Sequence, residues 1–381
     1  MKNTNNQELA QLLAGLDKNE VNHLYKRAAM MRKARAARVK TSRFEGDEDG
    51  PILVRGPRSE SLDEVVLRLL RESKPEPQLR MTSSRDGLVV QVSKRMCTVL
   101  VDGAEVSCAL SPELARTQQT SIAVGDEVVV ATYAGSDDLV VDSVRPRRTA
   151  LSRPDPGNPN IERVIVANVD LIGVVVSLKT PPLHPRIIDR YLIAIQRGGA
   201  EPLLVVNKLD LASPSDRKIE LGKLEPYTAA GVGTVYCSAD SGEGMPALRE
   251  RLKGKLCAFV GHSGVGKSSL LNALKPELDL KAKAVSEGYG RGTHTTTAST
   301  LYDLGDGTRI IDTPGIRSFG LWKLEPDELQ WYFPEFAEWS QQCKFRDCTH
   351  SHEPECGVRR AAEEGRINCA RHETYLRLLN P

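Results

Sequence analysis

The sequence predicts a multidomain protein in which a small β-barrel, a parallel α/β domain and a mostly helical C-terminal domain follow one another. Three observations support this organisation. Short alternating strands fill residues 81–148, apolar strands alternate with amphipathic helices over residues 149–320, and cysteines gather beside histidines within residues 321–381. At roughly 100–200 residues per domain, a chain of 381 residues has room for these parts.

Residues 1–80 are predicted to be a basic N-terminal arm that is partly helical or disordered. Between Lys26 and Arg43 the sequence has eight basic residues and no acidic one. The Ala/Arg-rich pattern favours a helix, and no hydrophobic core is evident. Two interpretations stay open, because an acid-free run repels itself without a partner: a solvated helix on a flexible arm, or an arm that orders on RNA phosphates.

The barrel is predicted from five short alternating runs between Gly87 and Val144, which Asp-Gly, Gly-Asp and Gly-Ser turns separate. An OB-fold is the natural candidate, although an SH3-like barrel has the same signature. Tyr133 is the only aromatic residue between Gly87 and Arg148, so stacking on bases is not expected here. Contact with a polyanion would instead use basic side chains. These are Lys94, Arg95, Arg145, Arg147 and Arg148.

The stretch "RPRRTALSRPDPGNPN", residues 145–160, is predicted to be a Pro/Arg-rich linker. After it, six apolar runs predict the strands of a parallel α/β sheet. They are Leu171–Ser177, Pro202–Val206, Thr234–Cys237, Leu256–Val260, Thr300–Leu304 and Arg309–Asp312.

A phosphate-binding loop is predicted at "GHSGVGKS", residues 261–268, which fits G-x-x-x-x-G-K-[ST] and lies between an apolar strand and a helix. Its glycines let backbone amides turn toward phosphates, Lys267 would reach the β and γ phosphates, and Ser268 would ligate Mg²⁺. The residues predicted to contact the nucleotide in this loop are Gly261, Gly264, Val265, Gly266, Lys267, Ser268 and Ser269.

A guanine site is predicted at "NKLD", residues 207–210, which follows an apolar strand. The Asp210 carboxylate can accept hydrogen bonds from the N1 and exocyclic amino groups of guanine, while Asn207 would contact the base edge and the Lys208 stem its face. Adenine offers Asp210 neither donor, and an unpaired buried acceptor costs roughly 1–3 kcal/mol. This difference selects GTP over ATP.

A second guanine-reading loop is predicted at "CSAD", residues 237–240, which also ends a strand. Ser238 and Ala239 would complete the base site, with the Ala239 amide facing the guanine oxygen. Four letters alone are a weak signal, but two such loops at strand ends are a stronger one.

The segment "IIDTPG", residues 310–315, completes the predicted triphosphate site. Asp312 would hold Mg²⁺ through water, and the Gly315 amide would sense the γ-phosphate. The Gly-rich segment before it contains Thr295 and Thr296, either of which could be a second magnesium ligand, and we prefer Thr296. The expected cofactors are therefore GTP or GDP with Mg²⁺.

Hydrolysis is predicted to be slow without a partner. Gly315 is followed by Ile316, which cannot hydrogen-bond to a water molecule, and GTPases with an incomplete catalytic set turn over at about 10⁻⁴ to 10⁻² per second. His294 is the candidate for positioning water, with Thr296 and Lys267 as the other catalytic residues. The alternative for His294 is a histidine that contacts only RNA or solvent.

The order of these motifs is base-reading loops, phosphate loop, then γ-phosphate segment, whereas a phosphate loop normally opens its domain. A doubly wound sheet keeps its strand positions when old termini are joined and new ones open in a loop, because termini usually lie close together on the surface. The sequence therefore predicts a circularly permuted P-loop α/β GTPase domain, whose γ-phosphate segment leads into the C-terminal region.

A metal site is predicted in the C-terminal region, where one histidine and three cysteines follow the pattern C-x₄-C-x-H-x₅-C. Three thiolates and one imidazole make a closed tetrahedral set, which is typical of structural zinc. The candidate ligands are Cys343, Cys348, His350 and Cys356, with His352 as an alternative to His350. Because this stretch is too polar to bury a core, one zinc ion per chain would supply folding energy.

From about residue 81 to 377 the chain resembles the RsgA (also called YjeQ) family of circularly permuted GTPases. The permuted order, "GVGKSSLLNAL", "HTTT", "DTPG" and the cysteine pattern carry this resemblance. It implies an OB-fold barrel, a GTPase domain and a zinc domain in that order, and it selects His350 over His352. It also implies GTP hydrolysis that the small ribosomal subunit stimulates.

The resulting hypothesis is a GTPase of late small-subunit maturation that binds rRNA in its GTP state and leaves after hydrolysis. Two alternatives stay open: an RNA-binding protein with a static structural GTP, and a GTPase translation factor. We expect no membrane contact, because Asn168 and Asp170 interrupt the most apolar stretch. We also expect the protein to be a cytoplasmic monomer.

Overall fold

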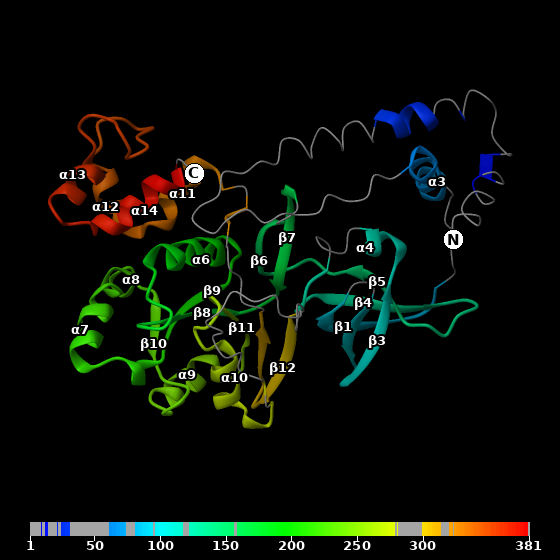
Figure 1. Ribbon diagram of the computed structural model, residues 1–381, viewed down its shortest axis with the longest axis horizontal. Coiled ribbons are helices and arrows are strands. Elements are labelled where there is room, and N and C mark those ends of the chain that lie inside the picture. Colours follow the sequence, from blue (N-terminus) through cyan, green and yellow to red (C-terminus); the bar gives the residue numbers. More distant parts are fainter. Residues whose placement is uncertain are drawn as a thin grey trace. The chain divides into compact units, whose positions relative to one another are not determined.

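Figure 1 shows a computed structural model of the protein. It describes residues 9, 12–13, 21, 24–30, 61–73, 81–93, 96–116, 122–155, 158–278, 280, 299–313, 320–322 and 324–379. The chain divides into two compact units, Met1–Leu79 and Arg80–Pro381. In the part of the chain that the structure describes, none of the helices is long and apolar enough to cross a membrane.

The first unit contains a small hydrophobic core, which the sequence analysis did not find. Helix α3 (Leu62–Ser73) begins with a capping box, in which the Glu64 amide donates to Ser61 Oγ and the Ser61 amide donates to the Glu64 carboxylate. Its apolar side chains cluster with distant residues of the same unit. The buried members are Leu9, Ala28, Val65, Val66, Leu67 and Leu69. Ala28 and Val65, the nearest buried members of its two halves, are 37 positions apart, so no local pattern shows this core.

The barrel is a closed five-stranded sheet. Its strands are β1 (Met81–Val92), β2 (Met96–Val101), β3 (Ala104–Leu110), β4 (Glu127–Tyr133) and β5 (Val140–Val144). They pair in the order β1-β2-β3-β5-β4 and close through β1 and β4, with β3 and β5 parallel. Helix α4 (Pro112–Arg116) follows β3. This Greek-key order is that of the OB-fold, which decides between the two barrels that the sequence left open.

A mostly parallel sheet forms the α/β domain. Its strands are β8 (Leu171–Ser177), β9 (Glu201–Asn207), β10 (Gly233–Tyr236), β11 (Leu256–Val260), β12 (Thr300–Gly305) and β13 (Thr308–Asp312). They lie in the order β10-β9-β8-β11-β13-β12, and β12 alone of these six is antiparallel to its neighbour. All six predicted strands are present, and each end lies within one residue of the predicted end.

Helices cover both faces of this sheet (Figure 1). Alternate side chains of β8 point to opposite faces, so Ile172 and Val174 pack with α6 (Pro185–Arg197) and α8 (Glu225–Ala229). Val175 packs on the other face. That face carries α9 (Met245–Leu252) and α10 (Lys267–Leu274), and the remaining elements of the domain are η1 (Leu209–Leu211), α7 (Pro214–Gly222) and η2 (Pro276–Leu278).

The prediction of a linker at residues 145–160 is wrong, because most of this stretch belongs to a β-hairpin. Strands β6 (Ala150–Asp155) and β7 (Asn158–Ala167) pair antiparallel. Leu151 and Val166 are fully buried in the main core, although proline and arginine dominate the local composition. Tertiary burial of a few apolar residues therefore decided the structure here.

The barrel and the α/β domain share one continuous sheet. Strand β1 pairs with β12 at Gln91 and Thr300, and Asn168 Nδ2 donates to the Gly125 carbonyl at 3.0 Å. Thr300, the first residue of β12, therefore lies beside the barrel strand β1.

The C-terminal region consists of short helices around an aromatic core. They are α11 (Pro326–Leu329), η3 (Gln330–Tyr332), η4 (Pro334–Phe336), α12 (Ala337–Ser340), α13 (Gly357–Glu363) and α14 (Cys369–Leu379). Phe336 lies between Phe333 and Tyr375, with ring centroids 5.2 and 5.0 Å away. The polar metal-site loop has no core of its own, and it packs instead on this aromatic core.

A buried ion-pair cluster joins this region to α6. Arg371 of α14 donates to Asp189 of α6 at 2.5 Å and to both oxygens of Glu335 at 2.7 and 3.1 Å. Its guanidinium also lies over the rings of Tyr227 and Phe333. Arg371 and Asp189 are 5% and 1% exposed, so the pair is screened very little.

Candidate nucleotide and metal sites

The phosphate loop has backbone angles that only glycine adopts easily. Gly261, Gly264 and Gly266 have φ values of 145°, 84° and 96°. A Cβ atom on Gly261 would lie 2.3 Å from the Val175 carbonyl oxygen, and one on Gly266 would lie 2.3 Å from Asn207 Nδ2. Neither position can hold a larger residue without movement of the backbone or of Asn207.

Lys267 is a buried cation at the start of α10. Its Nζ donates to the carbonyls of Gly261 at 2.8 Å and His262 at 3.2 Å. Burial lowers its pKa to about 8, although Asp312 opposes this effect. Burial likewise raises the pKa of Asp312, which Lys267 partly offsets. Ser268 and Ser269 are half-buried in the same helical turn, so the site offers an ammonium, hydroxyls and a carboxylate to a ligand.

Asn207 joins three segments that lie far apart in the sequence. Its Nδ2 donates to the Val265 carbonyl at 3.0 Å, and its Oδ1 accepts from the Ala239 amide at 3.1 Å. Asn207 is 1% exposed, and both of its polar groups have protein partners. Asn207 therefore joins the base-reading loops to the phosphate loop and takes up the N–H of Ala239, while its contact with the base edge stays a prediction.

Lys208 reinforces the same junction. Its Nζ donates to the Gly264 carbonyl at 2.6 Å and to the Thr180 carbonyl at 2.8 Å. Burial lowers the pKa of Lys208, while Asp210 opposes the shift. Thr180 was not among the predicted residues, since a carbonyl partner leaves no signal in the sequence.

Asp210 is exposed, and its carboxylate is oriented by a buried hydroxyl. Ser238 Oγ donates to Asp210 Oδ1 at 2.5 Å and accepts from the Ser241 amide at 3.1 Å. Ser238 is completely buried, so its rotamer is fixed by packing. Among the described residues, the second carboxylate oxygen of Asp210 has no hydrogen-bond partner.

The structure thus brings most predicted nucleotide residues together at the carboxyl ends of β9, β10, β11 and β13. Thr313, which the sequence analysis did not single out, is 1% exposed and donates to the Phe259 carbonyl at 2.6 Å, which ties β13 to the phosphate-loop strand. The predicted residues His294, Thr296 and Gly315, with Thr295 and Ile316, lie outside the described residues.

Three of the five barrel residues predicted to contact a polyanion pair with acidic side chains in the structure. Arg145 pairs with Asp86 at 2.6 Å and Arg148 with Asp170 at 3.2 Å. Arg147 makes a bidentate pair with Asp126, which is fully buried. These arginines already have acidic partners, and Lys94 and Arg95 lie outside the described residues.

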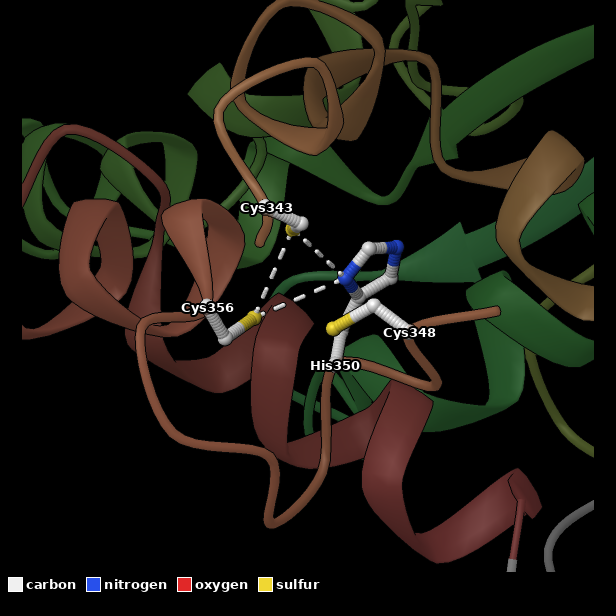
Figure 2. A group of neighbouring side chains, drawn as sticks. All are labelled: Cys343, Cys348, His350 and Cys356. Carbon is white, nitrogen blue, oxygen red and sulfur yellow. Dashed lines mark hydrogen bonds between the residues drawn. The ribbon is translucent and has the colours of Figure 1, made fainter. Parts of the chain in front are cut away.

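The metal-site residues form a compact cluster, in which the sulfur atoms and the imidazole point toward one another (Figure 2). All four candidate ligand atoms lie within 4.8 Å of one another. The Cys343 and Cys356 sulfurs are 3.9 Å apart, and His350 Nδ1 lies 3.6 and 3.5 Å from them. Tetrahedral zinc would place sulfurs about 3.8 Å apart and sulfur and nitrogen about 3.6 Å apart. The cluster therefore fits one tetrahedral metal ion.

The imidazole is already in the form that binds a cation, whereas the thiols would need the cation in order to lose their protons. Burial raises the pKa of the Cys348 and Cys356 thiols, and burial lowers the pKa of His350. A neutral imidazole is the form that binds metal, and a bound cation favours thiolates. His352 lies outside the cluster and is exposed, with Nδ1 2.8 Å from Ser351 Oγ.

Glu353 shapes the loop that carries His350. Its carboxylate accepts from the amides of Thr349, Ser351 and His352 at 2.8, 3.1 and 3.2 Å. Burial would raise its pKa, but the hydrogen bonds from Thr349 and its neighbours lower it to about 2. The Glu353 carboxylate is therefore ionised at neutral pH and holds the backbone of this loop through these hydrogen bonds.

Comparison with known proteins gives the family of this fold and site. The family model described as RsgA GTPase matches residues 144–322. A small ribosomal subunit biogenesis GTPase RsgA of Gemmatimonas aurantiaca is 38% identical over 302 residues, which cover 78% of this chain and 97% of the relative. One from Actinobacillus pleuropneumoniae is 41% identical over 301 residues, which cover 77% and 85%. The chain belongs to the RsgA GTPase family.

Solved structures agree with this assignment. YjeQ from Thermotoga maritima aligns with a TM-score of 0.61 and 35% identity, covering 78% of this chain and 98% of that structure. YloQ, described as a circularly permuted GTPase, aligns with a TM-score of 0.55 and 25% identity, covering 78% and 94%. The protein is thus a circularly permuted GTPase, and membership of the RsgA GTPase family implies guanine nucleotide and Mg²⁺ as cofactors.

Proposed function

We propose that this protein hydrolyses GTP during late maturation of the small ribosomal subunit, binding rRNA in its GTP state and leaving after hydrolysis. The observation that carries the proposal is the pair of hydrogen bonds by which Asn207 joins the base-reading loop to the phosphate loop. The relatives named as small ribosomal subunit biogenesis GTPases support the choice of partner. We further propose that it acts as a cytoplasmic monomer.

The base end of the site would be read by Asp210. Its free carboxylate oxygen and the one held by Ser238 can accept from the N1 and amino groups of guanine. Asn207 and Lys208 keep both loops in place. The single N–H of Ala239 already donates to Asn207 Oδ1, so it would reach the guanine oxygen only as a donor shared between the two. Since adenine would leave the Asp210 carboxylate unpaired, this arrangement selects guanine.

The phosphate end would be held by Lys267 and the first turn of α10. Lys267 Nζ lies against two carbonyls that carry only partial charge, so a triphosphate is the stronger partner for its ammonium. Ser268 would ligate Mg²⁺ directly and Asp312 through water. When bound, Mg²⁺ neutralises charge that develops on the phosphate oxygens.

The catalytic assignments remain predictions from the sequence. Lys267 would stabilise the charge on the γ-phosphate, Thr296 would be the second magnesium ligand, Gly315 would sense the γ-phosphate and His294 would position water. Ile316 offers no hydrogen bond where many GTPases place a glutamine, so we propose slow turnover that the small subunit stimulates.

Charge distribution indicates which part would contact rRNA phosphates. The barrel region, residues 81–148, has seven basic and nine acidic residues, whereas Lys26–Arg43 has eight basic residues and no acidic one. Phosphate contacts dominate nonspecific affinity for nucleic acids. We therefore propose that the N-terminal arm makes most of these contacts, and that the barrel recognises shape.

The C-terminal cluster is proposed to hold one structural zinc ion. Cys343, Cys348, His350 and Cys356 leave no open ligand position in a tetrahedral site, so a catalytic role is not proposed. The zinc domain and the N-terminal arm would both bind rRNA. The γ-phosphate segment precedes the zinc domain in the chain, so a change in this segment on hydrolysis would be passed to the zinc domain.

The decisive experiment measures phosphate release with and without purified small subunits across a salt series. We expect slow release alone, clear stimulation by free small subunits, and weaker stimulation as salt rises. Lys267→Ala should abolish both rates. No stimulation would favour a static structural nucleotide on an RNA-binding protein, and equal stimulation by assembled ribosomes would favour a translation factor.

A further inference from the structure

The two ring nitrogens of His350 face different partners. Nδ1 lies 3.6 Å from Cys343 Sγ and 3.5 Å from Cys356 Sγ, within the cluster. Nε2 lies 3.1 Å from the side-chain oxygen of Gln330, in η3. A neutral imidazole has one N–H donor and one lone pair, so the partner of one nitrogen decides what the other can bind.

The side-chain amide of Gln330 is oriented by a second hydrogen bond. Its Nε2 group donates to the Asp327 carbonyl at 3.4 Å, which leaves Oε1 directed at His350. An oxygen can only accept, so Nε2 of the imidazole carries the proton and Nδ1 presents its lone pair to the thiol sulfurs.

The structure assigns Gln330 as the positioning residue of the proposed zinc site: it fixes the tautomer of His350 and makes Nδ1 the metal ligand. This inference rests on the zinc site of the proposed function. Ligating histidines commonly donate their second N–H to a carboxylate, carbonyl or water, which fixes the ring and strengthens binding. Here a glutamine amide has that place.

Other neighbours hold His350 without deciding its tautomer. The ring of Phe336 meets the imidazole edge-on at 5.9 Å, and Tyr375 lies 6.2 Å away. His372 Nε2 contacts the His350 carbonyl at 3.1 Å, which holds the backbone. These contacts restrict the ring plane, but either nitrogen could still carry the proton. The Gln330 oxygen removes that ambiguity.

A neutral amide also suits the charge of this cluster. Three thiolates and one Zn²⁺ already carry a net charge of about −1 in a largely buried place, and a second negative charge would cost free energy there. A carboxylate at position 330 would add such a charge, whereas the glutamine supplies the acceptor without it. Gln330 also lies in the segment after residues 310–315, so the zinc ligand is bonded to that segment.

The test uses the full-length protein and three variants. Gln330→Leu removes the acceptor at similar size, Gln330→Glu keeps an acceptor, and Gln341→Leu is a matched control at an exposed glutamine of the same region. Zinc affinity is measured by competition with a chromophoric chelator, and the His350 tautomer by ¹⁵N NMR of the zinc-loaded protein.

We expect Gln330→Leu to weaken zinc binding about 10–100-fold and to speed exchange of the His350 Nε2–H with solvent. Gln330→Glu should recover most of the affinity, and Gln341→Leu should match the wild type. The inference is wrong if the zinc affinity of Gln330→Leu is within twofold of the wild-type affinity, or if zinc is bound by Nε2 in the wild type. Neither result would contradict the zinc site itself. If the wild type binds no zinc, or if Cys348→Ser binds zinc as tightly as the wild type does, the proposed zinc site itself is wrong.

Discussion

The nucleotide site and the metal cluster are held together in different ways. In the nucleotide site, Asn207 and Lys208 bond the loops directly to one another, so the protein itself supplies the attraction. In the metal cluster, thiols whose pKa burial raises meet an imidazole at metal-ligand spacing. Thiols and an imidazole attract one another weakly, so a cation must supply the attraction. The difference implies that one site survives loss of its ligand and the other does not.

Removal of zinc should therefore have the largest effect. Apparent binding free energies of structural zinc in small peptides are about 10–16 kcal/mol at neutral pH, and loss of the ion removes that contribution. We expect Cys348→Ser, or a zinc-selective chelator, to unfold Cys343–Cys356 and to loosen α14. Hydrogen exchange of these segments measures the effect.

Nucleotide removal and Cys369→Ser serve as controls for this prediction. Cys369 is exposed and lies outside the cluster, so its substitution should leave exchange unchanged. Release of nucleotide should leave the bonds of Asn207 intact. Equal protection of the metal loop before and after chelation would remove the contrast between the two sites.

The next largest effect should come from the junction between the two regions. Arg371→Met leaves the buried Asp189 and the half-buried Glu335 without their cation, and loss of one partner of a buried pair costs about 3–5 kcal/mol. We expect the free energy of opening of α14, measured by native-state hydrogen exchange, to fall by this amount. Arg377→Met, at an exposed position of the same helix, should change it by about 0.5 kcal/mol or less. Similar losses in both variants would show that α14 is held by its own core instead.

Local pattern was enough to predict the strands and the motifs, but not the bonds between them. Each predicted strand has a run of apolar residues, and each nucleotide loop ends a strand, so both leave local signals. The hairpin β6–β7 was missed because its buried residues Leu151 and Val166 are hidden among prolines and arginines. The hydrogen bonds of Asn207 to Val265 and Ala239 were not predicted, because tertiary packing brings these partners together. Gln330 had no signal at all, since a glutamine well before the cysteine motif gives no hint of contact with His350.

Within the nucleotide site, Asn207→Ala should weaken binding without changing base choice. The substitution leaves the Val265 carbonyl and the Ala239 amide without their partner, at roughly 1–3 kcal/mol, or about 5–150-fold in affinity. We expect GTP and ATP to lose affinity by similar factors, measured by calorimetry. Asp210→Asn should instead lower the preference for GTP over ATP. If Asn207→Ala changed selectivity as Asp210→Asn does, Asn207 would read the base after all.

The smallest effect should be a pH dependence that belongs to the nucleotide site alone. Burial lowers the pKa of Lys267 to about 8, whereas phosphates beside its Nζ would favour the ammonium and raise that pKa in the complex. The complex then holds more protons than the free protein above about pH 8, so GDP affinity should fall by up to tenfold per pH unit as pH rises from about 8 to 9. The nucleotide-free fold should show the opposite sign, because the unfolded chain, with an ordinary lysine pKa of 10.5, binds more protons between the two values, and stability rises with pH there. Lys267→Arg stays charged throughout and should flatten the affinity profile. A flat profile in the wild type, or the same slope in Lys267→Arg, would show that Lys267 does not titrate in the site.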